Sequence, residues 1–407
     1  MTDNAMTLAS AFDHNTTTYT ATWRATYAAL RQECPMRRAE AYGGFYVVAR
    51  NEDVRRVLLD SETFSSDHGV EFDGIGIPPF PIRAIPVETD PPEHTGYRRL
   101  LTPWFTPAAA AGWELFARDV TTAALDAVIE TGSMDLVLDL VSPVPAILIA
   151  KLFGLPTEDW RVYSQAAHPN HVAGSGGEKP QSSWPAVLQR VMEVVRARRL
   201  DPRDDLVTAI ATAEIDGRRL PEEETLQVCF QVIAAGVDTT TSLASESLWW
   251  LSQHPEAREW LRADPGRIDG ACEELLRYFS TTQAVARTVT RDVEVNGRSL
   301  HRGDRVLVSL ASANLDDTGF DRANEVVLDR TPNRHVGFGL GPHRCVGMHL
   351  ARVTFRVMVE ELLERVPDFT VDPAKSQHYE LIGMVNGWQS LSATFTPGAR
   401  RGSSFRF

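Results

Sequence analysis

One stretch decides how this 407-residue chain is interpreted: Phe338-Gly339-Leu340-Gly341-Pro342-His343-Arg344-Cys345-Val346-Gly347. Glycines surround a single cysteine, and a helical pattern begins directly after it. A thiol just before a helix faces unpaired backbone N–H groups and the positive end of the helix dipole, which both favour the thiolate. Glycines also let the backbone pass close to a flat, bulky ligand. The stretch therefore predicts a cysteine thiolate that binds a ligand.

Two other interpretations of this stretch are open when it is taken alone. A lone cysteine is most often buried and inert, and a glycine-rich loop before a helix can instead cradle a phosphate. The phosphate loop is disfavoured because the glycines do not follow the order GxGxxG and no strand of normal length leads straight into them. A thiolate in this position suits haem iron, since a negative axial ligand pushes electron density towards O–O cleavage.

A second informative segment lies in the middle of a predicted helix over residues 222–253, which would be about 45 Å long at ~1.5 Å per residue. It reads Ala234-Ala235-Gly236-Val237-Asp238-Thr239-Thr240-Thr241. Hydroxyl side chains compete for backbone carbonyls and can open a helix locally, which leaves room for a diatomic ligand and a water. The alternative is that alanine and glycine serve close helix packing and the threonine run is incidental.

Two further motifs pair charged residues along a helix. Glu274 and Arg277 are three residues apart on one face, where such a pair is usually a solvated contact of little energetic value. The segment 90–99 begins with Asp90 as a candidate cap and two prolines, and Glu93 stands where a capping-box acid belongs. His94 and Arg98 then face the same way, and a buried pair of this kind needs an anion.

In this order the motifs resemble the cytochrome P-450 family. Residues 338–347 match the family's signature Phe-x-x-Gly-x-(Arg/His)-x-Cys-x-Gly at every fixed position. The sequence Ala-Gly-x-Asp-Thr resembles its oxygen-binding motif, and Glu274-Leu275-Leu276-Arg277 resembles its Glu-x-x-Arg motif. The resemblance extends from about Tyr19 to Thr396. It departs at Leu328, where an aromatic residue is common, which puts local packing in doubt.

The resemblance implies a fold that is mainly α with small β-sheets, and a single haem-thiolate monooxygenase domain over residues 1–407. Cys345 is then the iron ligand of haem b (iron protoporphyrin IX), with dioxygen as co-substrate. Thr239 would stabilise dioxygen at the iron and Asp238 would relay protons, since splitting O–O to water requires two protons. Glu274 and Arg277 would be structural.

The resemblance also implies which residues contact the haem. Four basic residues would clamp its propionates: His94, Arg98, Arg287 and His343. Further contacts are expected from Ala235, Gly236, Phe338, Gly339 and Gly347, while His335 is a weaker candidate.

The substrate pocket is expected to be lined by the loop 65–88, the middle of the long helix and the segments 281–286 and 383–386. Its candidate residues are mostly apolar: Phe72, Ile75, Ile77, Phe80, Ile82, Ala234, Val285, Met384 and Val385. An apolar pocket is the general expectation for a ligand site, so this pattern discriminates little. We expect hydroxylation or oxidative O-dealkylation of a small, hydrophobic aromatic or terpenoid compound.

Two alternatives to a monooxygenase stay open. A non-enzymatic haem-thiolate sensor would keep Cys345 and the clamp but would not need Asp238 and Thr239. The other alternative is an enzyme of the same fold that uses peroxide or catalyses a rearrangement. A peroxide-using relative need not have the acid and alcohol pair, so the presence of Asp238 and Thr239 favours dioxygen as the oxidant.

Composition limits the partners. The net charge of −13 argues against nucleic-acid binding through a general electrostatic field. The four cysteines form no CxxC pair, and no signal or membrane-spanning segment is found, which favours a cytoplasmic location. No flavin or nicotinamide fingerprint is present, so electrons from NAD(P)H would arrive through a ferredoxin and its reductase. Arg99, Arg344, Arg352 and Arg356 are candidates for a positive docking patch, or ordinary solvated arginines.

The pattern of apolar residues is mostly helical. It predicts helices at 19–33, from about residue 51, through most of 90–279, and from Val346 towards Arg365. Strands are predicted at 44–49, 293–295 and 305–308, flanking the turn residues Asn296-Gly297 and Gly303-Asp304. The segment 173–179 is expected to be a solvent loop or a lid hinge.

Overall fold

The computed structural model of the chain describes residues 12–33, 36–72, 82–167 and 183–407. These residues form two compact units, each assembled from separate parts of the sequence. Unit 1 comprises Met1–Tyr97, Glu273–Cys345 and Glu380–Asn386, and unit 2 comprises Arg98–Cys272, Val346–Tyr379 and Gly387–Phe407. Among the described residues, no helix is both long and apolar enough to cross a membrane. The segment 173–179 and the pocket candidates Ile75, Ile77 and Phe80 lie outside the described residues.

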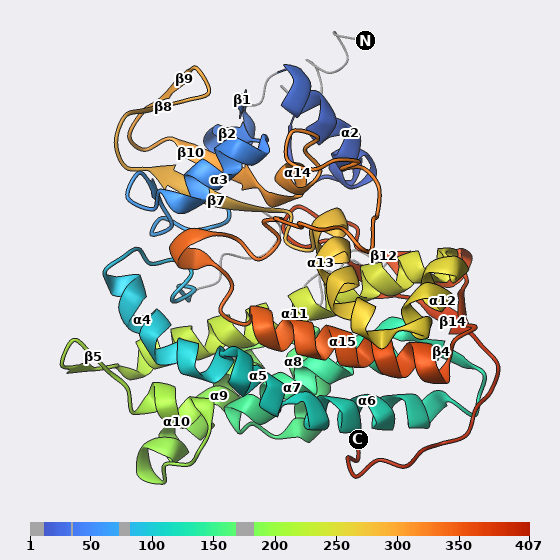
Figure 1. Cartoon of the computed structure of the whole chain (residues 1–407). Coiled ribbons are helices and arrows are strands. Elements are labelled where there is room, and N and C mark those ends of the chain that lie inside the picture. The colour runs from blue at the N-terminus through green and yellow to red at the C-terminus, as the bar shows by residue number, and fades with distance from the viewer. Residues whose placement is uncertain (1–11, 34–35, 73–81, 168–182) are drawn as a thin grey trace. The chain divides into compact units, whose positions relative to one another are not determined.

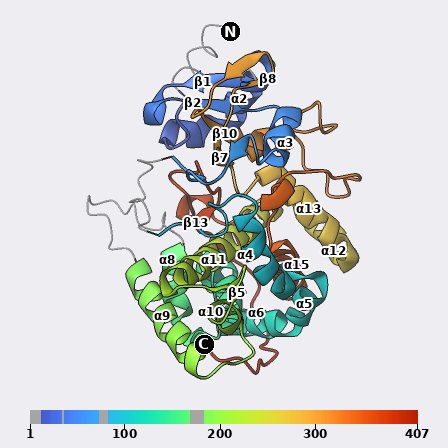
Figure 2. The same ribbon diagram turned by 90° about the vertical axis from the view of Figure 1, so that its left-hand side faces the viewer.

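Unit 1 is built on a five-stranded sheet with the order β1-β2-β10-β7-β3. Figures 1 and 2 label four of its strands, β1, β2, β10 and β7. The central strand β10 (Arg305–Ser309) pairs in parallel with β2 (Phe45–Val48) and antiparallel with β7 (Ala284–Val289). Residues 306–308 are all buried, as expected for a central strand that is covered on both faces. The edge strands are β1 (Met36–Ala39) and β3 (Phe64–Ser65).

Short helices and a hairpin complete unit 1. Its helices are α2 (Thr17–Glu33), α3 (Asn51–Leu59) and α14 (Leu310–Asn314). The predicted turn Asn296-Gly297 joins β8 (Val293–Val295) to β9 (Arg298–Leu300), and both turn residues have positive φ, 48° and 70°. This is the backbone that a two-residue hairpin requires, and Asn-Gly is its preferred sequence. Strand β9 was not predicted.

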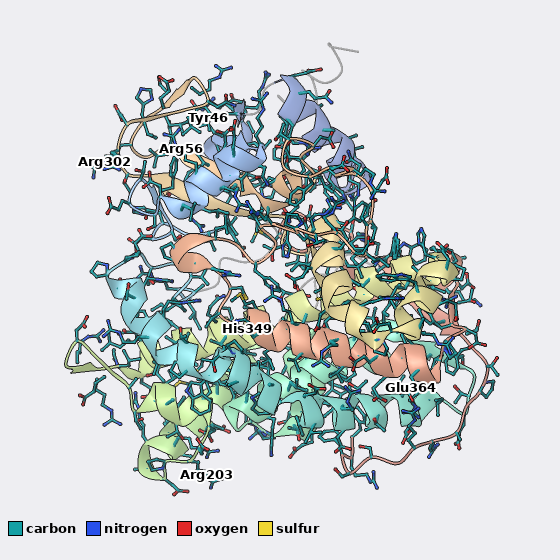
Figure 3. The ribbon with its side chains drawn as sticks, viewed as in Figure 1. Tyr46, Arg56, Arg203, Arg302, His349 and Glu364 are labelled. Atoms are coloured by element: carbon teal, nitrogen blue, oxygen red, sulfur yellow. The ribbon has the colours of Figure 1, made fainter. Side chains whose placement is uncertain are left out.

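Unit 2 is helical and centred on α11 (Glu222–Gln253), which has the predicted length. Figure 1 shows α15 (Met348–Arg365) running beside it, and α11 also packs against α7 and α8. Figure 3 labels His349 near the start of α15 and Glu364 near its end. The other helices of unit 2 are α5 (Pro107–Gly112), α6 (Glu114–Val128), α7 (Pro143–Phe153), α8 (Trp160–Ala167), α9 (Trp184–Leu200), α10 (Leu206–Ala211) and α12 (Pro255–Ala263).

Small strands accompany these helices, so the predicted mainly α architecture with minor sheets is confirmed. One sheet has the order β11-β14-β4 and two hairpins are formed by β5–β6 and β12–β13. Their bounds are Ser133–Asp135 for β4, Glu214–Ile215 for β5, Arg218–Arg219 for β6, Thr370–Val371 for β11, Gln377–His378 for β12, Trp388–Ser390 for β13 and Ser392–Thr394 for β14.

Helix α4 (Glu93–Leu101) begins as predicted after two prolines, but Asp90 does not act as its side-chain cap. The Asp90 carboxylate accepts hydrogen bonds from Ser65 Oγ and Ser66 N, and only its backbone carbonyl bonds to the helix, at His94 N (2.9 Å). The predicted capping box is also absent among the described contacts, because Glu93 pairs with Arg83 (3.6 Å). The side chains of Asp90 and Glu93 are therefore engaged by residues outside the helix and do not cap its N-terminus.

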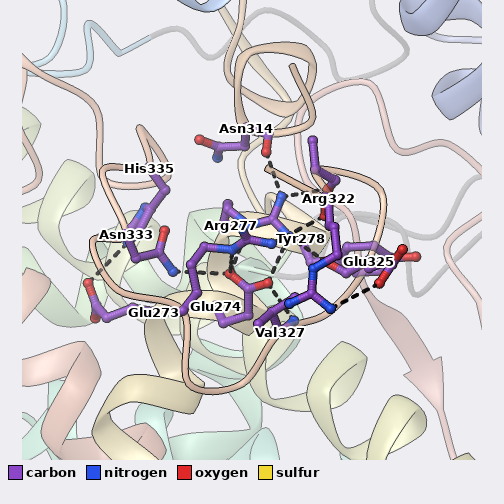
Figure 4. A network of polar contacts seen from close by, with 12 residues as sticks. Glu273, Glu274, Arg277, Tyr278, Asn314, Arg322, Glu325, Val327, Asn333 and His335 are labelled. Carbon is purple, nitrogen blue, oxygen red and sulfur yellow. Dashed lines mark hydrogen bonds and ion pairs between the residues drawn. The ribbon is translucent and has the colours of Figure 1, made fainter. Parts of the chain in front are cut away.

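A buried ion pair organises the loops of unit 1, as shown in Figure 4. Glu274 and Arg277, on α13 (Ile268–Phe279), have side chains of 0% exposure and form two hydrogen bonds of 2.8 Å. The remaining Arg277 donors bond at 2.7 Å to three backbone carbonyls: Asn314 at the end of α14, and Ala323 and Glu325 in the loop that follows. The Glu274 carboxylate also accepts hydrogen bonds from Val327 N, Arg330 Nε and Asn333 Nδ2.

The substitution Glu274→Gln keeps the volume of this side chain and removes its charge. It leaves Arg277 buried without a countercharge, so the free energy of unfolding should fall by about 3–5 kcal/mol. The control is Glu40→Gln in the exposed pair with Arg38 (2.6 Å), which should cost about 0.5 kcal/mol or less. Denaturant unfolding of both variants measures the difference, and equal losses would show that the Glu274 charge is not needed.

Candidate active site

The cysteine loop folds back on itself in unit 1. Cys345 N donates to Phe338 O (2.8 Å), which closes the loop, and a single 3₁₀ turn spans Gly341–His343 inside it. Cys345 is exposed, whereas Cys229 and Cys272 are buried, and none of these three described cysteines forms a disulfide. Helix α15 begins three residues later, at Met348. The thiol lies just before a helix, as the sequence predicted, and its role as the iron ligand stays a prediction.

Glycine is required at two positions of this loop. Gly339 and Gly341 both have φ of +67°, a left-handed conformation that side chains with a Cβ rarely adopt. A Cβ at Gly341 would lie 2.6 Å from Leu58 O, so this part of the loop packs directly on the end of α3. A Cβ at Gly339 would make only an ordinary contact, 3.6 Å from His343 O.

Three of the four predicted clamp residues lie in unit 1, and two of them, His94 and His343, are shown in contact. The rings of His94 and His343 are 4.3 Å apart, and His343 Nε2 lies 3.2 Å from Ser66 Oγ. Arg287 is buried on β7, and its Nη1 donates to Ala286 O (2.7 Å). Burial lowers the pKa of Arg287 to about 10, and the nearby Asp90 carboxylate opposes this shift. Arg98, on α4, is half-buried and belongs to unit 2.

These groups form a donor set that fits an anionic ligand. A buried guanidinium is costly unless an anion offsets it; among the described residues Arg287 forms no direct ion pair, and the Asp90 charge acts on it only at longer range. The imidazoles of His94 and His343 are further potential hydrogen-bond donors in unit 1. The carboxylates of haem are anions of this kind, and the exposed Cys345 supplies a soft ligand for its iron.

The acid and alcohol pair lies on α11 in unit 2. Thr239 Oγ1 donates to Ala235 O (2.7 Å), so the hydroxyl bonds to a helix carbonyl as predicted. The expected local opening is not seen, because α11 runs as one continuous helix over Glu222–Gln253. Asp238 is buried, and its Oδ1 accepts from Tyr379 Oη (3.0 Å). Ala235 is exposed and Thr239 is half-buried, which makes this side of an otherwise mostly buried helix accessible.

Gly236 serves helix packing, the alternative that the sequence left open for this segment. A Cβ at Gly236 would lie 2.6 Å from Ile149 Cδ1 on α7. The close approach of α7 and α11 therefore depends on this glycine. Its predicted contact with haem stays a prediction.

Comparison with known proteins establishes the family. A sequence model of the family described as Cytochrome P-450 matches residues 152–387. Cytochrome P-450 109 of Bacillus spizizenii is 31% identical over 350 residues, which cover 83% of this chain and 82% of that protein. The chain belongs to the cytochrome P-450 family. It is a cytochrome P-450 monooxygenase, an oxidoreductase.

Other relatives agree with the P-450 assignment. A steroid C26-monooxygenase of Mycolicibacterium smegmatis is 30% identical over 354 residues, 84% of this chain and 87% of that protein. The solved structure of a mutant of P-450 EryK in complex with erythromycin B has a TM-score of 0.84 and 30% identity, and the match covers 96% of this chain and 100% of that one. The structure therefore has the P-450 fold.

Two predicted pocket segments of this P-450 lie side by side in unit 1. Gln283 N donates to Met384 O (2.9 Å), Asn386 N donates to Thr281 O (2.8 Å), and Thr282 bridges to Val385. Phe72 is buried and its ring centroid lies 4.4 Å from that of Phe45. The other described candidates, Ile82, Ala234, Val285, Met384 and Val385, are half-buried.

Sequence reasoning missed several residues around the P-450 motifs. Arg330 joins Glu274, Ser66 contacts the clamp, and Tyr379 contacts Asp238; each is far from its partner in sequence, and no local spacing marks it. His335, the weaker candidate for haem contact, bonds through Nε2 to Glu273 (3.0 Å) and through Nδ1 to Gly337 N (3.0 Å). These contacts give His335 a role in holding the loop.

The two loop glycines provide a matched test of the cysteine loop. Gly339→Ala imposes only the strain of positive φ, about 1 kcal/mol, whereas Gly341→Ala adds a contact with the Leu58 carbonyl and should cost about 3 kcal/mol. The free energy of unfolding and the haem content of the purified proteins measure the effect. Equal losses for both variants would contradict the predicted packing of the loop on α3.

Proposed function

We propose that this P-450 inserts one oxygen atom of dioxygen into a small hydrophobic substrate, with haem b held by Cys345. The observation that carries the proposal is the accessible Cys345 thiol, in a hydrogen-bonded glycine loop directly before a helix. When bound, haem supplies the activation of dioxygen and the transfer of oxygen. Residues 1–407 act as one monooxygenase domain in this proposal.

The basic residues bind the cofactor's carboxylates. Arg287, His94 and His343 supply donors from unit 1, and Arg98 is assigned the same role by its place four residues after His94. Phe338, Gly339, Gly347, Ala235 and Gly236 are proposed as further haem contacts. The Arg287 guanidinium is buried in the folded protein, and a bound anion would offset the cost of burying its charge.

Asp238 and Thr239 deliver protons. The Asp238 carboxylate accepts protons that enter from solvent and passes each one to Thr239 Oγ1, which releases its own hydroxyl proton to the oxygen-binding side as it accepts the new one. The Thr239 hydroxyl bonds to Ala235 O within the helix and is half-buried, so it is ordered and still accessible. This pair favours monooxygenation with dioxygen over a haem-thiolate sensor and over peroxide or rearrangement chemistry, which do not need it.

Electrons reach P-450 proteins of this kind through redox partners, and we propose a ferredoxin with its NAD(P)H-dependent reductase. One of the four arginines suggested for docking, Arg356, is already paired with acidic residues of the chain. Arg356 pairs with Glu114 (2.7 Å), Glu360 (3.3 Å) and Asp269 (3.4 Å), so its charge is largely neutralised within unit 2. Arg99 and Arg344 are exposed and remain candidates for docking. A reducing cytoplasm is proposed from the dispersed cysteines.

The substrate is proposed to be an aromatic or terpenoid compound that is hydroxylated or O-dealkylated. The mostly apolar candidate pocket residues support a hydrophobic molecule. The names of relatives span a steroid monooxygenase and a protein bound to erythromycin B, so steroid and macrolide ligands belong in the same substrate screen. A shift of the haem spin state on ligand addition identifies what fits.

The proposed thiolate ligand is tested by Cys345→Ala. The reduced wild-type protein with carbon monoxide should show the red-shifted Soret band of thiolate ligation, and the variant should lose it. Cys229→Ala is the control, because burial raises the pKa of Cys229 to about 12 and keeps it an inert thiol. An unshifted band in the wild type, or an unchanged band in Cys345→Ala, would overturn the proposal.

The proton pair is tested by Thr239→Ala. The variant should bind substrate as the wild type does, yet convert most reducing equivalents to hydrogen peroxide, with product per NAD(P)H reduced roughly tenfold by loss of an ordered hydroxyl. The neighbouring Thr240→Ala, whose side chain is buried, is the control. An unchanged ratio of product to NAD(P)H consumed in Thr239→Ala would remove this residue from the mechanism.

A further inference from the structure

A stripe of polar residues runs along one face of α11, beginning at the acid of the proton pair. Asp238, Ser242 and Glu246 recur every four residues, so their side chains lie above one another on the helix. All three are buried, with at most 7% exposure, in a helix that otherwise buries mainly apolar residues. Buried polar groups are stable only when they find partners, so another segment must cover this stripe.

That segment is the hairpin β12–β13 with the residues next to it. Gly387 lies so close to α11 that a Cβ there would be 2.6 Å from Ser242 Oγ and 3.1 Å from Ser242 Cα. Trp388 N donates to Ser245 Oγ (3.2 Å), and Tyr379 N donates to Gly387 O (3.0 Å). The close packing at Gly387 therefore places the side chain of Tyr379 against the polar stripe.

The Tyr379 hydroxyl meets the carboxylate of Asp238. Tyr379 Oη donates to Asp238 Oδ1 (3.0 Å), and Ser242 Oγ lies 3.4 Å from both of these atoms. Burial and the neighbouring Asp238 charge raise the pKa of Tyr379 well above its ordinary range, so the hydroxyl keeps its proton and stays a donor. Tyr379 thus makes the shorter of the two hydroxyl contacts at Asp238 Oδ1, and the single Ser242 proton can be donated either to Asp238 or to Tyr379.

A second contact fixes the backbone of Tyr379. The His378 ring bridges through Nε2 to Glu246 Oε1 (2.9 Å) and through Nδ1 to Tyr379 O (3.0 Å). The ring also packs edge-on against Trp388, with centroids 4.9 Å apart. The polar stripe and the hairpin are therefore joined at both ends, at Asp238 by Tyr379 and at Glu246 by His378.

We propose that Tyr379 is a positioning residue for proton delivery, which orients the Asp238 carboxylate through its hydroxyl. The inference rests on the proposed function, in which Asp238 relays protons to Thr239. A carboxylate that is free to rotate spends part of its time away from its proton acceptor. The bond from Tyr379, supported by Ser242, holds Asp238 in one orientation, because a hydrogen bond to a charged group is stronger than one between neutral groups.

The test is Tyr379→Phe, which removes one hydroxyl and keeps the ring. Substrate affinity and the carbon monoxide band should match the wild type, while product per NAD(P)H should fall about tenfold, the effect of losing one hydrogen bond to a charged group. The solvent deuterium isotope effect on product formation should rise, because proton transfer becomes slower. The control is Tyr163→Phe: Tyr163 is also buried in unit 2, and its hydroxyl has no partner among the described residues.

A double-mutant cycle with Asp238→Asn separates this inference from the proposed function. Asp238→Asn alone should lower product formation by about 10²-fold or more, as expected for a proton-transfer group. If Tyr379 acts through Asp238, Tyr379→Phe should cause no further loss in the Asp238→Asn background. Wild-type coupling in Tyr379→Phe, or the same loss in both backgrounds, would overturn the positioning role. Normal activity of Asp238→Asn would instead refute the proposed proton relay itself.

A second variant covers the case in which Tyr379→Phe lowers the haem content. Ser242→Ala removes the other hydroxyl near Asp238 Oδ1 and leaves the ring of Tyr379 in place. Ser242→Ala should also lower the product formed per NAD(P)H, but by a smaller factor than Tyr379→Phe. The separation of 3.4 Å between Ser242 Oγ and Asp238 Oδ1 indicates a weaker bond. If Tyr379→Phe cannot be purified with haem, an unchanged ratio of product to NAD(P)H in Ser242→Ala would contradict the proposal.

Discussion

The buried carboxylate of Glu274 is the constraint on which unit 1 depends. A charge with no exposure to water is stable only if its hydrogen-bonding capacity is filled, and Glu274 achieves this with two arginines, an amide side chain and a backbone N–H group. Through Arg277 the same pair holds the carbonyls of Asn314, at the end of α14, and of Ala323 and Glu325 in the loop that follows. The stretch that leads into the Cys345 loop is thus ordered by polar contacts, because it contains little regular secondary structure of its own.

The same physical rule operates in unit 2, where α11 carries polar side chains through a largely apolar interior. Asp238, Ser242 and Glu246 are buried, and residues from the hairpin β12–β13 supply their partners. In a low-dielectric interior these hydrogen bonds are stronger than in water, and a buried polar group without a partner is costly. The helix α11 therefore requires the hairpin to pack against it in this position, and the hairpin requires the polar residues of α11. The proposed role of Tyr379 follows from this requirement, since the residue that satisfies Asp238 also fixes its orientation.

Much of the fold was predictable because it depends on periodicity along the chain. The helix α11 has the predicted bounds, and the Asn296-Gly297 turn forms the hairpin that its residue types favour. The failures occurred where a distant partner replaced a local one. Asp90 was expected to cap α4, yet its carboxylate accepts hydrogen bonds from Ser65 and Ser66.

The sequence by itself determined the family and the residues of its local motifs: the thiolate candidate Cys345, the pair Asp238 and Thr239, and the pair Glu274 and Arg277. These are readable because their chemistry depends on neighbours within a few positions along the chain. Only the tertiary structure decided which residues support them. Tyr379 lies 141 positions from Asp238 and Arg330 lies 56 positions from Glu274, and burial makes each of them necessary to its partner. A requirement that arises from desolvation appears only when the chain has folded and removed the group from water.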